Sequence, residues 1–230
     1  MAASEVYVLL SCAMSVDGAI DDASEKRLLL SDPADLDRVD AVRAGCDAIL
    51  VGANTIRSDN PRLQVRSAER RRARRDRGLP DSPIKVTVTG GGRLDPAAAF
   101  FTMGEADKLV YCASPAVAAT RARLGHVATV VDGGDPIDLP AVLADLADRG
   151  VRRLLVEGGS RTHTAFLAAG LADELHLVVA PFFVGDAAAP RFVHPGAFPH
   201  GPGHPMTLAN VRRIGDLVLL DYRLDRCSST

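Results

Sequence analysis

The sequence predicts an α/β fold with a mainly parallel central sheet and a C-terminal antiparallel hairpin. Apolar segments of strand length alternate with helix-like segments along most of the 230 residues, which is typical of parallel strands joined by helical crossovers. Residues 48–52 (AILVG) are apolar throughout, as expected for a strand covered on both faces. Near the end of the chain, two strand-like segments flank Gly215 and Asp216, a typical hairpin signal.

Each element follows from a local pattern. The helix predicted over 33–45 has Asp32 as its N-cap, Pro33 at its first position and Gly45 at its end. We predict strands at 6–14, 48–52, 84–89, 108–112, 127–131, 152–157, 174–181, 206–214 and 217–224. We predict further helices at 115–124, 139–149 and 162–169, and long loops at 62–83 and 185–205. No linker interrupts the pattern, so we expect one domain over residues 1–230.

Composition excludes several classes of protein. With 47% hydrophobic residues and a net charge of −2, the chain is not disordered and has no general attraction for nucleic acid or membranes. No apolar run approaches the roughly 18 residues of a membrane span, and the first residues do not resemble a signal peptide. The four cysteines, Cys12, Cys46, Cys112 and Cys227, lack zinc-ligand spacing. We therefore expect buried thiols with a tail thiol at Cys227, no metal, and a cytoplasmic protein.

The first candidate site is a glycine-rich turn between the strand over 152–157 and the next helix. Ligands bind beyond the carboxyl ends of parallel strands, and helix N-termini attract anions, so this turn is a candidate pyrophosphate site. A tight turn that binds nothing is an equally weighted interpretation. The Rossmann and Walker motifs are both absent. The residues concerned are Gly158, Gly159, Ser160, Arg161 and Thr162.

Three other turns carry polar residues after strands. Gly52 precedes Thr55 and Asp59, which one helical turn would place on the same face; the alternative is a short capped helix without a ligand. Thr89 and Gly91, in a loop ending at Arg93, could hold the adenosine end of a dinucleotide, although a flexible loop is favoured locally. The segment 15–18 reads as a simple turn.

Two charged or metal-ligating groups have plain interpretations. The arginine-rich run over 66–77 lacks the interleaved aromatic residues of a nucleic-acid site, so we favour a solvated helix. Arg66, the first member of the run, is a candidate for a different role, because we expect it to lie closest to the cleft at Asp59. His194, His200 and His204 lack the spacing of a helical metal site and are predicted as loop residues.

Taken in order, three stretches resemble the reductase family of riboflavin biosynthesis. They are MSVDGAI (14–20), SDPADLDRVDAVRAGCDAILVGANTIRSDNPRLQVR (31–66) and LLVEGGSRTHTAFLAAGLADELHLVVAPFFVGD (154–186). The family comprises the C-terminal reductase domain of bacterial RibD and the free-standing archaeal and fungal pyrimidine reductases. The resemblance covers nearly the whole chain, and it implies a dihydrofolate-reductase-like three-layer sandwich that forms a homodimer.

The resemblance also implies NADPH as hydride donor and a ribosylaminopyrimidine 5′-phosphate as acceptor, whose ribose becomes a ribityl group. Family positions for the cofactor fall on Ala13, Thr55, Asp59 and 159–165. Family positions for the substrate fall on Arg43, Leu63, Arg66 and Glu157. We expect Arg66 to hold the phosphate and Glu157 to accept from the ribose or pyrimidine. Asp59 or a water molecule would supply the proton.

The resemblance leaves the acceptor open. Ser11 stands where many bacterial members have Lys, which favours the diaminopyrimidinone substrate of archaeal members. A reductase of the same fold that acts on dihydrofolate is the second hypothesis, although the chain has no Trp to line a folate site. A nucleic-acid-binding protein without catalytic activity is the third, and it would bind through the run over 66–77.

Overall fold

The structure is a computed structural model that describes residues 6–22, 24 and 28–226. Cys227, predicted as a tail thiol, lies outside the described residues. The chain divides into two compact units, and each is described by itself. Unit 1 includes Asp40–Leu155, and unit 2 includes Val8–Val39 and the chain from Val156 onward. The prediction of a single domain stays a prediction.

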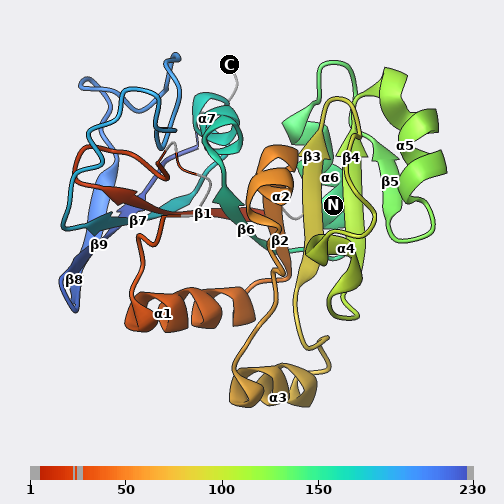
Figure 1. Cartoon of the computed structure of the whole chain (residues 1–230), viewed down its shortest axis with the longest axis horizontal. Coiled ribbons are helices and arrows are strands. Elements are labelled where there is room, and N and C mark those ends of the chain that lie inside the picture. The colour runs from red at the N-terminus through yellow and green to blue at the C-terminus, as the bar shows by residue number, and fades with distance from the viewer. Residues whose placement is uncertain (1–5, 23, 25–27, 227–230) are drawn as a thin grey trace. The chain divides into compact units, whose positions relative to one another are not determined.

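The strands of unit 1 are parallel and follow the order β5-β4-β3-β2. Figure 1 shows β3, β4 and β5 side by side, with α5 next to β5. The strands are β2 (Ala48–Gly52), β3 (Ile84–Thr89), β4 (Lys108–Cys112) and β5 (Thr129–Asp132). The helices are α2 (Ala53–Asp59), α3 (Ala68–Asp76), α4 (Ala99–Thr102), α5 (Val117–Leu124) and α6 (Leu139–Asp148), with a 3₁₀ turn at Ser114–Ala116.

Burial in unit 1 matches the sequence pattern. All five residues of β2 are buried, which confirms the prediction of a strand covered on both faces. The helix α3 lies inside the predicted loop 62–83 and confirms the helical interpretation of the arginine-rich run. One part of that interpretation is wrong, because Arg74 on α3 is only 2% exposed and does not belong to a solvated face.

A buried lysine joins β3 to α4. The side chain of Lys85 is wholly buried, and its Nζ donates to the carbonyls of Phe100 at 3.1 Å and Met103 at 2.6 Å. Burial lowers the pKa of Lys85 to about 8, and the charges of Lys108 and Arg43 act in the same direction. The ammonium thus satisfies two carbonyls at the ends of the short α4.

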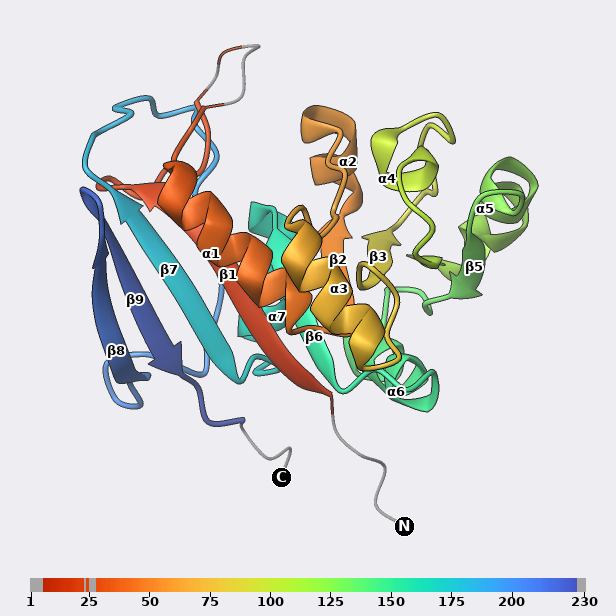
Figure 2. The ribbon, with the colours of Figure 1, turned by 90° about the horizontal axis from the view of Figure 1, so that it is seen from below.

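Unit 2 contains the antiparallel end of the fold. The strand β1 (Tyr7–Ser15) pairs in parallel with β7 (Glu174–Ala180). Next, β9 (Leu217–Arg223) runs antiparallel to β7, and β8 (Thr207–Ile214) runs antiparallel to β9. Figure 2 shows β7, β9 and β8 side by side. The turn between β8 and β9 contains Gly215, which confirms the predicted C-terminal hairpin.

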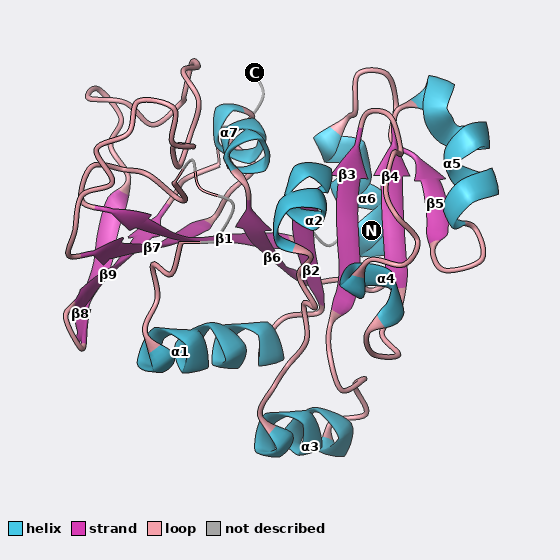
Figure 3. Ribbon diagram, in the orientation of Figure 1, coloured by secondary structure: helices cyan, strands magenta, loops and turns pink. Residues whose placement is uncertain are grey.

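Three elements cross the division between the units, and the first is β1, whose first residue, Tyr7, belongs to unit 1. The helix α1 (Pro33–Ala44) begins in unit 2 and ends in unit 1, whereas β6 (Arg153–Gly158) begins in unit 1 and ends in unit 2. The strand β6 leads into α7 (Ser160–Ala168), which starts two residues before the predicted helix. Figure 3 shows the chain between β7 and β8 as loop, in agreement with the predicted loop over 185–205.

One hydrophobic cluster of unit 2 lies on β7 and the hairpin. Its members are buried apolar side chains, and three partly buried residues pack against them. The cluster is formed by Leu30, Val178, Ala180, Ile214, Leu217 and Leu219, and the residues packed against it are Ala13, Leu28 and Phe182. Within the described ranges, no helix is long and apolar enough to cross a membrane.

Candidate functional site

The turn between β6 and α7 in unit 2 has a backbone that requires glycine. Gly158 has φ +110°, and a Cβ at this position would lie 2.8 Å from Nε2 of His163. Gly159 is the N-cap residue of α7 and offers no side chain to cap it. Ser160 and Thr162 are buried in the first turn of α7, whereas Arg161 is exposed. A helix that begins without a capping side chain presents backbone N–H groups and a positive dipole end, which suit a phosphate.

His163 supports this turn from beneath. It is 1% exposed, its ring centroid lies 5.3 Å from that of Phe192, and its Nδ1 has no hydrogen-bond partner among the described residues. Burial lowers the pKa of His163 to about 4, so the imidazole is neutral at physiological pH. A neutral ring packed on Gly158 fills the space behind the turn without adding charge.

A chain of hydrogen bonds connects α7 to the turn after β1. The hydroxyl of Ser160 donates to the carbonyl of Arg191, and the guanidinium of Arg191 donates to the carbonyl of Asp17. The Asp17 carboxylate accepts from the backbone N–H groups of Val184 at 3.1 Å and Gly185 at 2.9 Å. Hydrogen bonds to Ser15 and to these N–H groups hold the pKa of Asp17 well below its usual range. The segment 15–18 is therefore an anchor for the long loop after β7.

The remaining predicted site residues of unit 2 lie on strands. Ala13 is partly buried on β1, and it packs against the same hydrophobic cluster as Leu28 and Phe182. Glu157 is half-buried on β6, directly before the Gly158 turn. Because β6 ends at this turn, Glu157 directly precedes the candidate pyrophosphate site in the sequence.

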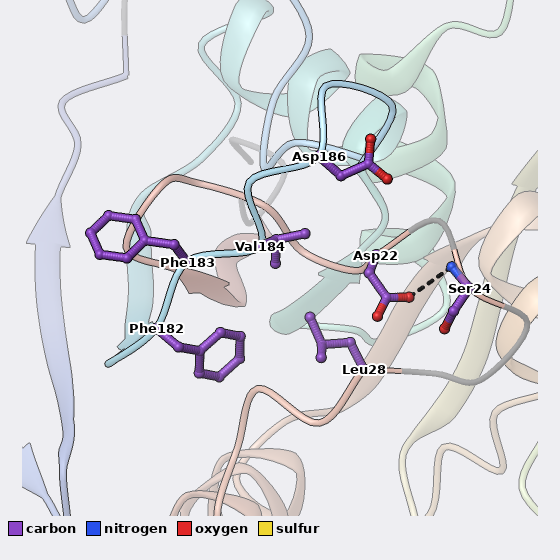
Figure 4. Close-up of a pocket in the computed structure, with 7 residues that line it drawn as sticks. All are labelled: Asp22, Ser24, Leu28, Phe182, Phe183, Val184 and Asp186. Atoms are coloured by element: carbon purple, nitrogen blue, oxygen red, sulfur yellow. Dashed lines mark hydrogen bonds between the residues drawn. The ribbon is translucent and has the colours of Figure 1, made fainter.

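A pocket of ≈ 410 Å³ lies beside the segment after β1 (Figure 4). In Figure 4, Leu28, Phe182, Val184 and Asp22 point toward one another, while Phe183 points away. The carboxylate of Asp22 accepts from the backbone N–H of Ser24 at 2.9 Å. The pocket thus combines apolar walls with two carboxylates, those of Asp22 and Asp186.

The matching turn of unit 1 joins β2 to α2. Gly52 has ordinary extended backbone angles, φ −69° and ψ 152°. Thr55 and Asp59 are both half-buried on α2 and are four residues apart, in agreement with the prediction that they share a face. Asn60 ends the helix in a left-handed conformation, and its side chain accepts from the N–H of Ala99 at 2.7 Å.

The neighbouring strand brings the predicted adenosine-binding loop to the same sheet edge. Gly52 pairs with Val88, so Thr89 at the end of β3 lies next to the α2 turn. The hydroxyl of Thr89 accepts from the N–H of Gly92 at 3.2 Å and closes the loop around the exposed Gly91. The loop is therefore a defined turn at this strand.

The predicted substrate residues of unit 1 follow the same segment. The guanidinium of Arg43 donates to the carbonyl of Gln64 at 3.2 Å. Leu63 has φ +46° and is 2% exposed, so its side chain belongs to the core. The side chain of Arg66 is 54% exposed, and its backbone N–H donates to Asp40 at 2.5 Å. The described part of the chain therefore presents Arg66 to solvent and buries Leu63.

Sequence reasoning missed the supporting roles of Asp40 and Arg191, and it gave Asp17 and His163 no role of their own within the segments 15–18 and 159–165. Their contacts join residues far apart in sequence, such as Asp17 and Arg191, and no local pattern indicates them. The arginine-rich run mainly bonds protein groups: Arg74 donates to the carbonyls of Ala44, Cys46 and Pro80.

The histidines and cysteines of the described residues form no metal cluster. No group of three or more metal-ligating side chains occurs among the residues described. His200 and His204 stack with ring centroids 5.0 Å apart in the loop before β8. Among the described residues, Cys12, Cys46 and Cys112 form no disulfide.

Known proteins resemble this chain over nearly its whole length. A 2,5-diamino-6-ribosylamino-4(3H)-pyrimidinone 5′-phosphate reductase from Archaeoglobus fulgidus is 35% identical over 96% of this chain and 99% of its own. A pyrimidine reductase-like protein from Corynebacterium diphtheriae has the same fold, with a TM-score of 0.81, 20% identity, and coverage of 97% of this chain and 94% of its own.

A solved structure of lower sequence identity also shares the fold. Dihydrofolate reductase from Enterococcus faecalis, solved with NADP(H), has a TM-score of 0.53 and 14% identity over 95% of this chain and 96% of its own. This likeness confirms the predicted dihydrofolate-reductase-like fold. The model of the RibD C-terminal domain matches residues 6–220. The chain therefore belongs to the RibD C-terminal domain family.

Proposed function

We propose that this protein catalyses the pyrimidine reductase step of riboflavin biosynthesis, with NADPH as the hydride donor. The ribose of a ribosylaminopyrimidine 5′-phosphate would be reduced at C1′ to a ribityl group. The observation that carries the proposal is the 35% identity to the Archaeoglobus reductase over 96% of this chain. That alignment includes the candidate site residues of both units.

Each glycine turn, taken by itself, offers groups that suit one part of a dinucleotide. In unit 2, Gly158, Gly159 and the first turn of α7 would hold the pyrophosphate through backbone N–H groups. In unit 1, Thr55 and Asp59 would hold the nicotinamide half. When bound, NADPH supplies the hydride, and the protein contributes binding and orientation. The assigned cofactor residues are Ala13, Gly52, Thr55, Asp59, Thr89, Gly91, Gly158, Gly159, Ser160, Arg161 and Thr162.

The resemblance assigns two charged residues, Arg66 and Glu157, to the substrate. Arg66 would bind the 5′-phosphate as a bidentate donor. Glu157 would accept hydrogen bonds from the ribose hydroxyls or a pyrimidine amine, which orients C1′. Asp59, or a water molecule bound to it, would move the proton that the reduction requires. Arg43 and Leu63 would support the segment that carries Arg66.

We infer that the diamino form of the pyrimidine is preferred over its deaminated form. Ser11 on β1 supports this preference. Many bacterial members have Lys at this position, and its replacement by Ser favours the substrate of the archaeal members. The name of the Archaeoglobus relative points to the same substrate class. We also infer a homodimer in the cytoplasm, and light scattering of the purified protein would measure the oligomeric state.

The decisive experiment is NADPH oxidation with three acceptors offered separately: the diamino pyrimidine phosphate, its deaminated form and dihydrofolate. We expect turnover with the pyrimidines, fastest with the diamino form. NADPH binding without turnover on either pyrimidine would overturn the proposed reaction. Turnover on dihydrofolate alone would favour the second hypothesis.

Glu157→Gln tests the assignment at the substrate. We expect kcat/KM for the pyrimidine to fall by at least about tenfold, which corresponds to roughly 1.4 kcal/mol of transition-state stabilisation. The dissociation constant of NADPH, measured by fluorescence, should change less than about twofold. An equal loss of both would contradict the assignment of Glu157 to the substrate.

A further inference from the structure

We propose that Arg70 is a second ligand of the substrate's 5′-phosphate beside Arg66, and that the buried Asp40 positions both arginines. The inference rests on the proposed function, which supplies the phosphorylated substrate. It gives the arginine-rich helix α3 a function that neither nucleic-acid binding nor a solvated surface provides.

Both arginines meet on one carboxylate of unit 1. Oδ1 of Asp40 accepts from the backbone N–H of Arg66 at 2.5 Å, and Nε of Arg66 lies 3.7 Å from the same oxygen. Oδ2 accepts from Nη1 of Arg70 at 3.0 Å and from the N–H of Ser67 at 3.1 Å. Each oxygen therefore engages one backbone N–H and approaches one guanidinium.

The side chains of Asp40, Arg70 and Arg66 differ in how far they are exposed to solvent. The side chain of Asp40 is 2% exposed, that of Arg70 is 27% exposed and that of Arg66 is 54% exposed. The carboxylate is thus buried, while both guanidinium-bearing side chains reach solvent. A ligand can approach the arginines without displacing the carboxylate.

The charges favour a dianion. Burial alone would raise the pKa of Asp40, but the N–H of Arg66 and the guanidinium of Arg70 lower it below its usual value. The ionised carboxylate offsets one of two positive charges, so the cluster keeps one net positive charge. A phosphate monoester carries up to two negative charges and three acceptor oxygens, which two arginines recognise better than one.

Other bonds fix the arginines before a ligand arrives. Nη1 of Arg71 donates to the carbonyl of Arg66 at 2.7 Å, while the N–H of Arg66 donates to Asp40. Ser67 caps α3 by accepting from the N–H of Arg70 at 3.3 Å. The buried Arg74 ties the helix to the carbonyls of Ala44 and Cys46, each at 2.8 Å. A site held in this way loses little conformational freedom on binding.

The test compares phosphorylated and dephosphorylated pyrimidine substrates in Arg70→Gln. We expect KM for the phosphorylated substrate to rise about tenfold, as for the loss of one charge-assisted hydrogen bond. The KM of the dephosphorylated substrate, kcat and the dissociation constant of NADPH should stay within about twofold. Arg72→Gln is the matched control, because Arg72 is exposed on the same helix and carries the same charge. It should change none of these values.

Asp40→Asn tests the positioning. It keeps the size of the side chain but removes the charge that both arginines approach, so KM for the phosphorylated substrate should rise with kcat unchanged. Equal rises for both substrates in Arg70→Gln, or tighter phosphate binding in Asp40→Asn, would overturn the proposal.

Calorimetry with inorganic phosphate separates this proposal from the proposed reaction. If the wild-type protein reduces neither pyrimidine but binds phosphate more tightly than Arg70→Gln does, the proposed reaction is wrong and the proposed anion site stands. If the wild-type protein and Arg70→Gln reduce the pyrimidines with the same KM, the proposed reaction stands and the proposed anion site is wrong.

Discussion

The two strand-to-helix turns look alike in sequence and differ in structure. AILVGANT leads from β2 into α2, and LLVEGGSRT leads from β6 into α7. Gly52 has φ −69°, which any residue adopts, whereas Gly158 has φ +110° and contacts a buried His163. The first turns of the helices differ as well, because α7 buries Ser160 and Thr162.

Under the proposed function, the two turns would serve the cofactor in different ways. In unit 2 the backbone itself is specialised, so cofactor binding should depend on glycine and on what packs behind it. In unit 1 the backbone is ordinary, so cofactor binding should depend on the side chains of Thr55 and Asp59. Backbone substitutions should therefore damage the first turn, and side-chain substitutions the second.

Gly158→Ala should give the largest effect. Its Cβ would lie 2.8 Å from His163 at a strained φ, so we expect the unfolding free energy to fall by about 4 kcal/mol. We also expect NADPH binding to be lost. Gly52→Ala has no unfavourable φ and should lose about 1 kcal/mol or less. Urea unfolding and NADPH titration of both variants measure the contrast, and equal losses would break the comparison.

Acid should destabilise the α7 turn next. Burial lowers the pKa of His163 from 6.5 to about 4. Below pH 6.5 the unfolded chain binds a proton that the folded chain does not, so stability falls as pH drops from about 6.5 to 4, by up to about 3 kcal/mol. Urea unfolding across this range should show that loss in the wild type and not in His163→Leu. If the wild type and His163→Leu lose the same unfolding free energy over this pH range, His163 is not the cause of the loss.

Asp59→Ala should give the smallest effect on stability and a clear one on the cofactor. Asp59 is half-buried and accepts from the hydroxyl of the exposed Ser58 at 2.5 Å, so the unfolding free energy should change by less than about 1 kcal/mol. The dissociation constant of NADPH should rise about threefold to tenfold. Ser58→Ala keeps the carboxylate and serves as control. Unchanged affinity in Asp59→Ala would remove this residue from the cofactor site.

Local patterns predicted most of the fold. Apolar runs identified the strands, Gly215 and Asp216 indicated the hairpin, and the spacing of Thr55 and Asp59 placed them on one face. These features depend on neighbours in sequence, and their period is visible without a structure.

The supporting bonds could not be predicted in this way. Asp40 meets Arg66 across 26 positions, and Asp17 meets Arg191 across 174. Arg74 is buried and donates to carbonyls at the end of α1, before β2 and after α3, although its sequence neighbours indicate a solvated helix. Only the folded chain brings such donors and acceptors together.

Lys85 also makes the protein suitable for chemical footprinting. The chain has three lysines, Lys26, Lys85 and Lys108, so an acylating reagent meets few competing amines. The complete burial of Lys85 shields its amine from reagent in the folded protein. Its labelling rate should therefore report how often the β3–α4 region opens, read by mass spectrometry without introducing a probe.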